Sequence, residues 1–224
     1  MLDQLRIGDK YSFDDFSASV AQRSIKAPAK KVIKETVPFS NQTYDFSKIN
    51  GELYWEEREL EYVFEITADT PAELEYKKTA FSCWVMNVMN EAIYDPHEPN
   101  FHFVGTYDDM EYSDDESVEK TTATVTFKAY PYKIANEETR TLAIAHTTGE
   151  VNVRVTCQSA HRITPKVSTE RALTIIKDGV SYAVPDGISQ DGIFKLEPGD
   201  NVLKILNRSD VKCNVWIIFN EEVF

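Results

Sequence analysis

Two histidines lie close together in the segment DPHEPNFHF, where His97 and His102 are accompanied by Asp95 and Glu98. Imidazole nitrogens and carboxylates bind transition metals, so these side chains could bind one if the loop folded to bring them together. Their spacing matches no zinc motif. We therefore expect ordinary loop and strand residues here rather than a metal site.

A run of carboxylates follows in the segment DDMEYSDDESVEK, and carboxylates are the ligands that calcium prefers. The run consists of Asp108, Asp109, Glu111, Asp114, Asp115, Glu116 and Glu119. It lacks the D-x-D-x-D-G register and the closing glutamate of an EF-hand loop. The simpler interpretation is a solvated hairpin tip that carries most of the local charge.

The sequence also lacks motifs for nucleophilic catalysis, phosphate binding and nucleic-acid binding. No serine stands in a G-x-S-x-G elbow, and no glycine-rich loop is present that could bind a phosphate. Lys30, Lys31 and Lys34 form the only basic cluster. This cluster is small and contains no aromatic residues, which argues against a nucleic-acid site. We expect a protein that is not an enzyme and that uses no cofactor.

The composition narrows the class of protein further. The chain has 224 residues, a formal net charge of −13 and a pI near 4.8, so nonspecific attraction to nucleic acid or to anionic membranes is disfavoured. No apolar run is long enough to span a bilayer, and the N-terminus lacks the apolar core of a signal peptide. We expect synthesis in a cytoplasm, and buried thiols at Cys83, Cys157 and Cys213.

The first half of the chain combines strands with one helix. YWEERELEYVFEI alternates as a strand does, with Leu60, Tyr62, Phe64 and Ile66 on the face that we expect in the core. Upstream, residues 26–50 contain prolines and many small polar residues, which predicts long connections. A helix is predicted over residues 71–92. Its start is marked by an N-cap at Thr70, a proline at the first helical position and a glutamate at the third.

A hairpin and a second domain follow. FHFVGTY and TTATVTFKAYPYKI predict two strands joined by a polar loop. Pro131 would end the second strand, and the polar segment ANEETRT would then connect two domains. Short strands and turn signals alternate in the rest of the chain, a pattern typical of a β-sandwich. We therefore predict a mainly β protein with a β-sandwich-like domain at residues 1–138 that holds the helix, and a small β-sandwich at residues 139–224.

At this point the sequence resembles a known family. VPFSNQTYDFSKINGELYWEERELEYVFEI, followed by one helix and by a strand that ends in FKAYPYKI, is similar to the distal tail proteins of long-tailed siphophages and related prophages. The similarity covers nearly all of residues 1–135. The motif residues that carry it, which we expect to have structural roles, are Val37, Pro38, Asp45, Glu57, Arg58, Pro131 and Tyr132. Many members have a glycine in the turn after Val-Pro, where this chain has Phe39, Ser40 and Asn41.

The resemblance implies a function in the virion tail. In this family the first domains form a hexameric ring that joins the tail tube to the tip or baseplate, and DNA passes through the ring. The second domain is a galectin-like sandwich in fold, and relatives use it to dock receptor-binding or other baseplate proteins. The expected partners are therefore further copies of the chain, the tail tube protein and tip or baseplate proteins, with DNA only in passage and no membrane insertion.

A carbohydrate-binding module is the alternative. In that case the second domain would stack host glycans on aromatic rings such as Tyr182 and Trp216. Trp216 stands in the apolar segment CNVWIIF. That setting favours a place in the core over one on a sugar-binding surface.

Overall fold

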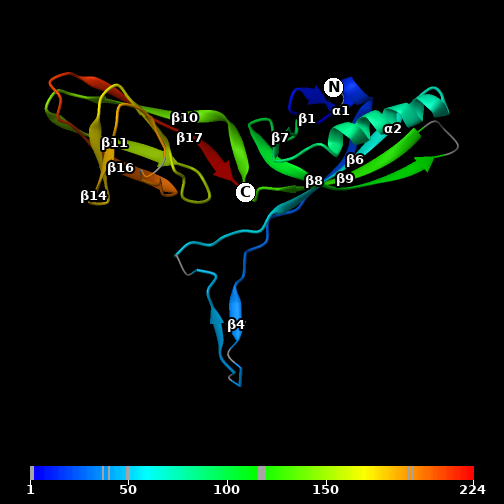
Figure 1. The fold of residues 1–224 in the computed structure, drawn as a ribbon, viewed down its shortest axis with the longest axis horizontal. Helices are drawn as coiled ribbons and strands as arrows, with labels where there is room; N and C mark the ends of the chain where they lie inside the picture. The colour runs from blue at the N-terminus through cyan, green and yellow to red at the C-terminus, as the bar shows by residue number, and fades with distance from the viewer. Residues whose placement is uncertain are drawn as a thin grey trace. The chain divides into compact units, whose positions relative to one another are not determined.

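The computed structural model describes residues 3–36, 38–39, 41–48, 51–115, 120–190, 192 and 194–224. The chain consists of two compact units, Met1–Lys133 together with Phe224, and Ile134–Val223. We call these the first and second unit and describe each by itself (Figure 1). Residues 134–138, which were predicted to end the first domain, belong to the second unit.

One sheet forms the body of the first unit, with the strand order β3-β6-β9-β8-β7-β1-β2. The bounds of its elements, with the short helix α1, are β1 Arg6–Ile7, β2 Lys10–Tyr11, α1 Ser12–Phe16, β3 Ala18–Ile25, β6 Arg58–Thr67, β7 Glu91–Tyr94, β8 Phe101–Asp115 and β9 Lys120–Ala129. Strand β6 lies between β3 and β9 and is antiparallel to both. Its buried and half-buried residues alternate, which confirms that Leu60, Tyr62, Phe64 and Ile66 face the core.

Helix α2, Pro71–Val85, covers the core face of this sheet. It begins as predicted: the Thr70 hydroxyl accepts a hydrogen bond from the Glu73 backbone N–H at 3.3 Å, and the Glu73 carboxylate accepts one from the Asp69 N–H at 3.1 Å. It ends earlier than predicted, at Val85 instead of residue 92. Asn90 adopts a left-handed conformation with φ of 55°, and the residues that follow pair with β8 as strand β7.

The predicted hairpin is present, but its charges lie elsewhere than expected. β8 continues through the acidic segment as far as Asp115 and pairs with β9 from Gly105 onward. Most of the acidic run is therefore strand, while residues 116–119 lie outside the described part of the chain. The threonines of β9 explain the difference, because β-branched residues favour an extended ladder even opposite charged side chains. β9 ends at Ala129, two residues before Pro131, as predicted.

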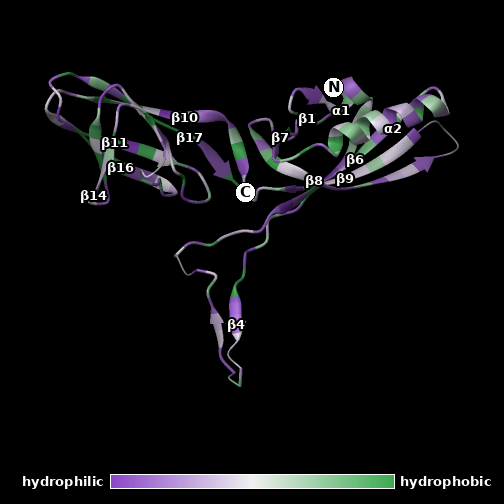
Figure 2. Ribbon diagram, in the orientation of Figure 1, coloured by the Kyte–Doolittle hydropathy of each residue, from purple (hydrophilic) through white to green (hydrophobic). Residues whose placement is uncertain are grey.

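A long extension leaves the sheet between β3 and β6. We call residues 26–57 the arm. It contains a two-stranded hairpin of β4, Lys34–Thr36, and β5, Thr43–Asp45. A bridge between Lys30 and Trp55 closes its base. Figure 1 shows β4 within the arm, and Figure 2 shows that β4 is hydrophilic. The long connection predicted for residues 26–50 is thus confirmed, with a short hairpin inside it.

The second unit is a β-sandwich, as predicted. One sheet has the order β15-β12-β17-β10 and the other β11-β16-β13-β14. The bounds are β10 Lys133–Ala145, β11 Gly149–Cys157, β12 Lys166–Thr169, β13 Leu173–Lys177, β14 Val180–Val184, β15 Gly187–Ser189, β16 Gly199–Asn207 and β17 Cys213–Val223. Apolar residues of both sheets form one core. The predicted KDG turn joins β13 to β14 with positive φ at Asp178 and Gly179, which suits a tight hairpin.

The cysteine prediction is correct for two residues and wrong for the third. Cys157 and Cys213 are buried in the core of the second unit, but Cys83 is exposed on α2. Helix α2 turns Phe81 and Val85 toward the sheet, and helical geometry then directs residue 83 away from it.

Candidate functional site

The sheet of the first unit has a solvent-exposed face on the side that α2 does not cover. Three rows of directly paired residues cross β6, β9 and β8 on this face. The rows are Glu61–Thr126–Asp109, Val63–Thr124–Glu111 and Glu65–Thr122–Ser113. We call this surface the acidic face. It is polar almost throughout, so it is built to contact water rather than to pack against a second apolar layer.

The charges of the acidic face are only partly neutralised. Lys26 and Lys128 both donate hydrogen bonds to the Glu59 carboxylate, and they lower the pKa of that carboxyl to about 2. Among the described residues, no cation forms an ion pair with Asp109 or Glu111. The face therefore carries carboxylates that repel other anions.

Residues of the histidine segment make structural contacts within the first unit. Asp95 is buried, and its carboxylate accepts a hydrogen bond from the Tyr62 hydroxyl at 3.2 Å and lies 3.2 Å from the Arg23 Nε. His97 donates its backbone N–H to the same carboxylate, whereas the ring of His102 packs against Tyr94. Within the described residues, no group of three or more potential ligands is arranged to bind a metal ion.

The structure separates the predicted motif residues of the arm and β6. Val37 lies outside the described residues. Pro38 is exposed in the turn of the arm, and Glu57 is exposed just before β6. The carboxylate of Asp45 in β5 accepts the backbone N–H of Ser47 at 2.9 Å, and hydrogen bonds from this serine are the main cause of its lowered pKa.

Arg58, the first residue of β6, is the exception among these residues because it is only 4% exposed. Its Nε is buried and forms no hydrogen bond in the described structure. The guanidinium carbon lies 5.6 Å from the centre of the Phe103 ring. Burial lowers the pKa of this guanidinium, and the charge of Glu98 opposes that effect. The molecule therefore retains a buried cation with few compensating contacts.

The two remaining motif residues mark the end of the first unit. Pro131 and Tyr132 are buried. The Tyr132 ring lies 5.4 Å from that of Tyr130 and 5.0 Å from that of Phe224. The Phe224 ring also meets Trp55 edge-on at 4.7 Å. This aromatic cluster anchors Phe224 to the first unit and explains why these positions are apolar.

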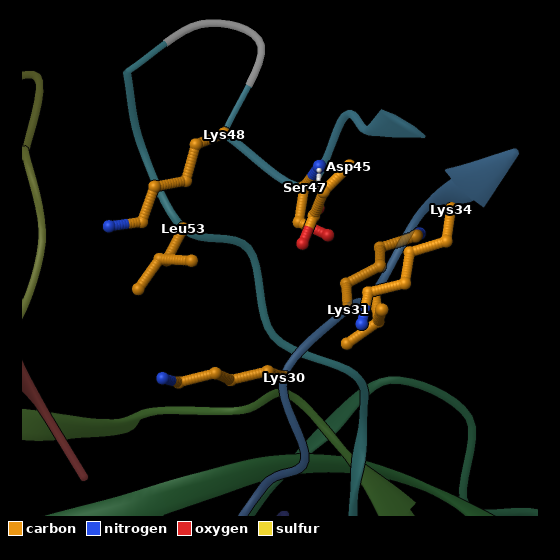
Figure 3. A pocket seen from close by; sticks show the side chains of 8 residues that line it. Lys30, Lys31, Lys34, Asp45, Ser47, Lys48 and Leu53 are labelled. Carbon is orange, nitrogen blue, oxygen red and sulfur yellow. Dashed lines mark hydrogen bonds between the residues drawn. The ribbon is translucent and has the colours of Figure 1, made fainter. Parts of the chain in front are cut away.

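Lysines line a hollow of about 330 Å³ on the arm. Its lining includes Lys30, Lys31, Lys34 and Lys48, and Figure 3 shows Lys30 and Lys48 extending to the same side with Leu53 between them. Among the described residues, no carboxylate forms an ion pair with any of these four amino groups. The sequence shows three of the lysines as a cluster, but it does not show that Lys48 joins them, because β5 returns alongside β4 only in the folded arm.

The two aromatic residues considered for glycan binding do not form a common platform. Trp216 is 38% exposed on β17, so the expectation that it lies in the core is wrong. The apolar residues on either side of it point inward, and strand alternation therefore turns Trp216 outward. Tyr182 lies on β14 in the opposite sheet, half-buried against the core, with its ring 5.9 Å from that of Phe194.

Comparison with known proteins identifies the fold. No family profile matches the sequence, and no curated protein matches it. The crystal structure of the phage SPP1 protein Dit matches over 100% of both chains, with a TM-score of 0.71 and 14% sequence identity. SPP1 Dit is a paradigm of the hub adsorption apparatus in phages that infect Gram-positive bacteria.

Two structures of the phage P2 baseplate in its activated conformation are also similar to this chain. The one with calcium covers 97% of this chain and 98% of its own, with a TM-score of 0.41 and 9% identity. The one with strontium covers 98% of each chain, with a TM-score of 0.42 and 10% identity. The SPP1 match establishes that this chain has the fold of a phage Dit protein, which confirms the fold expected from the sequence resemblance.

Proposed function

We propose that this chain is a structural hub protein, without catalytic activity, at the distal end of a long-tailed phage or prophage tail. Six copies would form a ring through their first units, between the tail tube and the tip or baseplate. The protein would be made in the cytoplasm of the bacterial host and would end in the virion tail. Among the described residues, no helix is long and apolar enough to cross a membrane.

The observation that carries this proposal is the acidic face. Its carboxylates and threonines stand on a sheet whose opposite side is covered by α2, which suits the wall of a water-filled channel. Carboxylates on such a wall repel phosphates, so DNA could pass without being held, whereas a wall rich in lysine and arginine would bind it. Among the described strands, β3 pairs only with β6. The Val20 N–H on its other edge donates to the Asp3 carbonyl, so the part of this edge beyond Val20 is the part that could pair with a neighbouring copy.

The second unit would dock other tail proteins. Leu142 and Ile144 on β10, Trp216 on β17 and Ile188 on β15 are exposed and belong to one sheet of the sandwich. Large exposed apolar side chains gathered on one sheet are typical of interaction surfaces. Receptor-binding and baseplate proteins are the expected partners. Glycan binding receives less support, because Tyr182 and Trp216 lie on opposite sheets.

Light scattering over a concentration series, followed by negative-stain imaging, tests the ring. We expect a hexamer with a central hole, formed either by the chain alone or after addition of the tail tube protein. A chain that stays monomeric with its tail partners would refute the proposal. A glycan array is the separate test of the carbohydrate alternative, and signal above background that is lost in Trp216→Ala would revive it.

A further inference from the structure

The hollow on the arm gathers lysines from both halves of the hairpin. Lys30 and Lys31 precede β4 and Lys34 begins it, whereas Lys48 follows β5 on the return half. Asp45 also lines the hollow, so four lysines and one aspartate give its lining a formal charge of +3. The arm as a whole, with five lysines, four glutamates and one aspartate, carries no net charge. The positive charge is therefore concentrated at one place.

The lysines of the hollow lack the partners that lysines of the sheet and its helix have. Each lysine of α2 and of β9 forms an ion pair with a carboxylate. Within the described residues, the four amino groups of the hollow form no ion pair, and the Lys30 ammonium faces the Trp55 ring at 5.9 Å from its centre. Hydrogen bonds from Ser47 lower the pKa of Asp45 more than the charges of the lysines do. Like charges around one hollow repel each other, so a bound anion would stabilise the folded arm.

We propose that this hollow binds a small anion with several phosphate groups, such as a tripolyphosphate chain. A phosphate group presents oxygens in several directions, so separate ammonium groups can contact it from different sides as point charges. Planar carboxylates suit the arginine fork instead, and the described lining contains no arginine. A single phosphate would leave part of the +3 charge uncompensated, whereas a chain of about three phosphates can compensate it.

Size and charge favour a small anion over a nucleic acid. The volume of about 330 Å³ lies within the range of roughly 300–1,000 Å³ that is typical of small-molecule sites. A DNA duplex would extend beyond the hollow and meet the rest of the chain, which carries the whole net charge of −13 because the arm is neutral. That part of the molecule repels an extended polyanion, while a compact one can reach the lysines alone.

A bound phosphate chain would link the two halves of the arm. β4 and β5 pair over only three residues each, and an isolated two-stranded hairpin is marginally stable in water. An anion that contacts Lys31 on one half and Lys48 on the other adds a connection to this short ladder. Binding should therefore make the arm more rigid. The site does not require a ring, so it goes beyond the proposed hub function and is tested independently of it.

Isothermal titration calorimetry with sodium tripolyphosphate tests the site, at low ionic strength because salt screens exposed charges. We expect saturable binding of one anion per chain. Lys31→Gln and Lys48→Gln should each weaken this binding about tenfold, the effect of losing one charge-assisted contact. Lys212→Gln removes an exposed lysine of the second unit that forms no ion pair in the described structure, and this matched control should leave the affinity unchanged.

Limited digestion with trypsin measures the rigidity of the arm in the same variants, since trypsin cleaves after exposed lysines. Tripolyphosphate should slow cleavage of the arm several-fold in the unmodified chain. In Lys48→Gln the cleavage sites at Lys31 and Lys34 remain, and tripolyphosphate should no longer protect them. Protection that persists in Lys48→Gln would show that the anion does not link the two halves of the arm.

Three other ligands separate the possible outcomes. Orthophosphate should bind more weakly than tripolyphosphate, and equal affinity would overturn the inference that several phosphates are recognised. Citrate that binds as tightly as tripolyphosphate would overturn the preference for phosphate. A short DNA duplex that binds more tightly than tripolyphosphate and loses affinity in Lys48→Gln would identify a nucleic-acid contact instead of a small-anion site. If tripolyphosphate does not bind, or binds the Lys31→Gln and Lys48→Gln variants as tightly as the unmodified chain, the proposed site is wrong and the hub function is unaffected.

Discussion

A buried arginine and a half-buried arginine of the first unit should respond in opposite ways to the same substitution. Arg58 is 4% exposed and its buried Nε makes no hydrogen bond in the described structure. The Arg23 Nε also makes no hydrogen bond, but the Arg23 guanidinium forms ion pairs with two carboxylates, with Nη2 at 2.5 Å from Asp3 and Nε at 3.2 Å from Asp95. We predict that Arg58→Met stabilises the isolated chain and that Arg23→Met destabilises it.

The magnitudes follow from what each substitution leaves behind. At Arg58 the methionine fills similar space and removes a poorly compensated charge, and such replacements commonly stabilise by about 2 kcal/mol. At Arg23 the substitution leaves the buried Asp95 carboxylate without its cation, which costs about 3 kcal/mol. For a unit of this size, these changes correspond to shifts in Tm of roughly +8 °C and −12 °C.

Urea unfolding followed by tryptophan fluorescence measures both variants. The background substitution Trp216→Phe removes the exposed tryptophan of the second unit, so that Trp55 and Trp84 report on the first unit. Measurements at low protein concentration keep the chain dissociated. If Arg58→Met lost as much stability as Arg23→Met, the guanidinium of Arg58 would have to make strong contacts within its own chain, and our interpretation of it as uncompensated would be refuted.

Four further outcomes are expected. The Glu59 carboxyl should titrate near pH 2 in carbon-detected NMR, so its contribution to stability is present above pH 4.5 and is lost as the pH falls toward 2. Lys128→Ala should raise the pKa of this carboxyl. An unchanged pKa would show that Lys128 does not stabilise the charged carboxylate. Thr70→Ala should lower the stability of the first unit by about 1 kcal/mol through loss of the N-cap. Thr79→Ala, on the exposed side of the same helix, should change this stability by less than about 0.5 kcal/mol. Equal losses in the two variants would contradict the capping argument. Phe81→Ala should lower the free energy of unfolding by about 4 kcal/mol in the same urea assay, because the fully buried Phe81 ring packs between the helix and the sheet. A loss below about 1 kcal/mol would mean that the helix does not depend on this contact. Replacing residues 32–53 with a short glycine-rich turn should leave the Tm of both units unchanged, because the bridge between Lys30 and Trp55 closes the base of the arm outside the replaced residues, and a lower Tm of the first unit would show that the sheet depends on the arm.

Local patterns predicted much of the fold. Alternation placed Leu60 and Phe64 in the core because only a strand with one buried face repeats every two residues. The start of α2 was predictable because Thr70 satisfies backbone N–H groups of the first turn, a contact made within four residues of the chain. The end of the helix was not predictable, since it depends on the pairing of β7 with β8, which the helical periodicity of residues 71–92 does not record.

The candidate functional surfaces were likewise only partly predictable from the sequence. The acidic run and the lysine cluster can be recognised in the sequence, but the surfaces to which they belong in the folded protein cannot. Pairing across β6, β9 and β8 turns Asp109 and Glu111 into part of one acidic face instead of a loop tip. Helix packing similarly decides that Cys83 and Tyr76 point away from the core.

By itself, the sequence determined the mainly β class, the single long helix and its N-terminal cap, the strand that ends before Pro131, and the sandwich in the second half. These features arise from interactions between residues close in the chain, which periodicity and turn chemistry record directly. Only the tertiary structure decided which charges share a face, that Arg58 is buried with few compensating contacts, that Trp216 is exposed, and that both the arm and the outer side of α2 leave apolar surface uncovered. Burial and charge compensation depend on segments far apart in the sequence, so they exist only once the chain has folded.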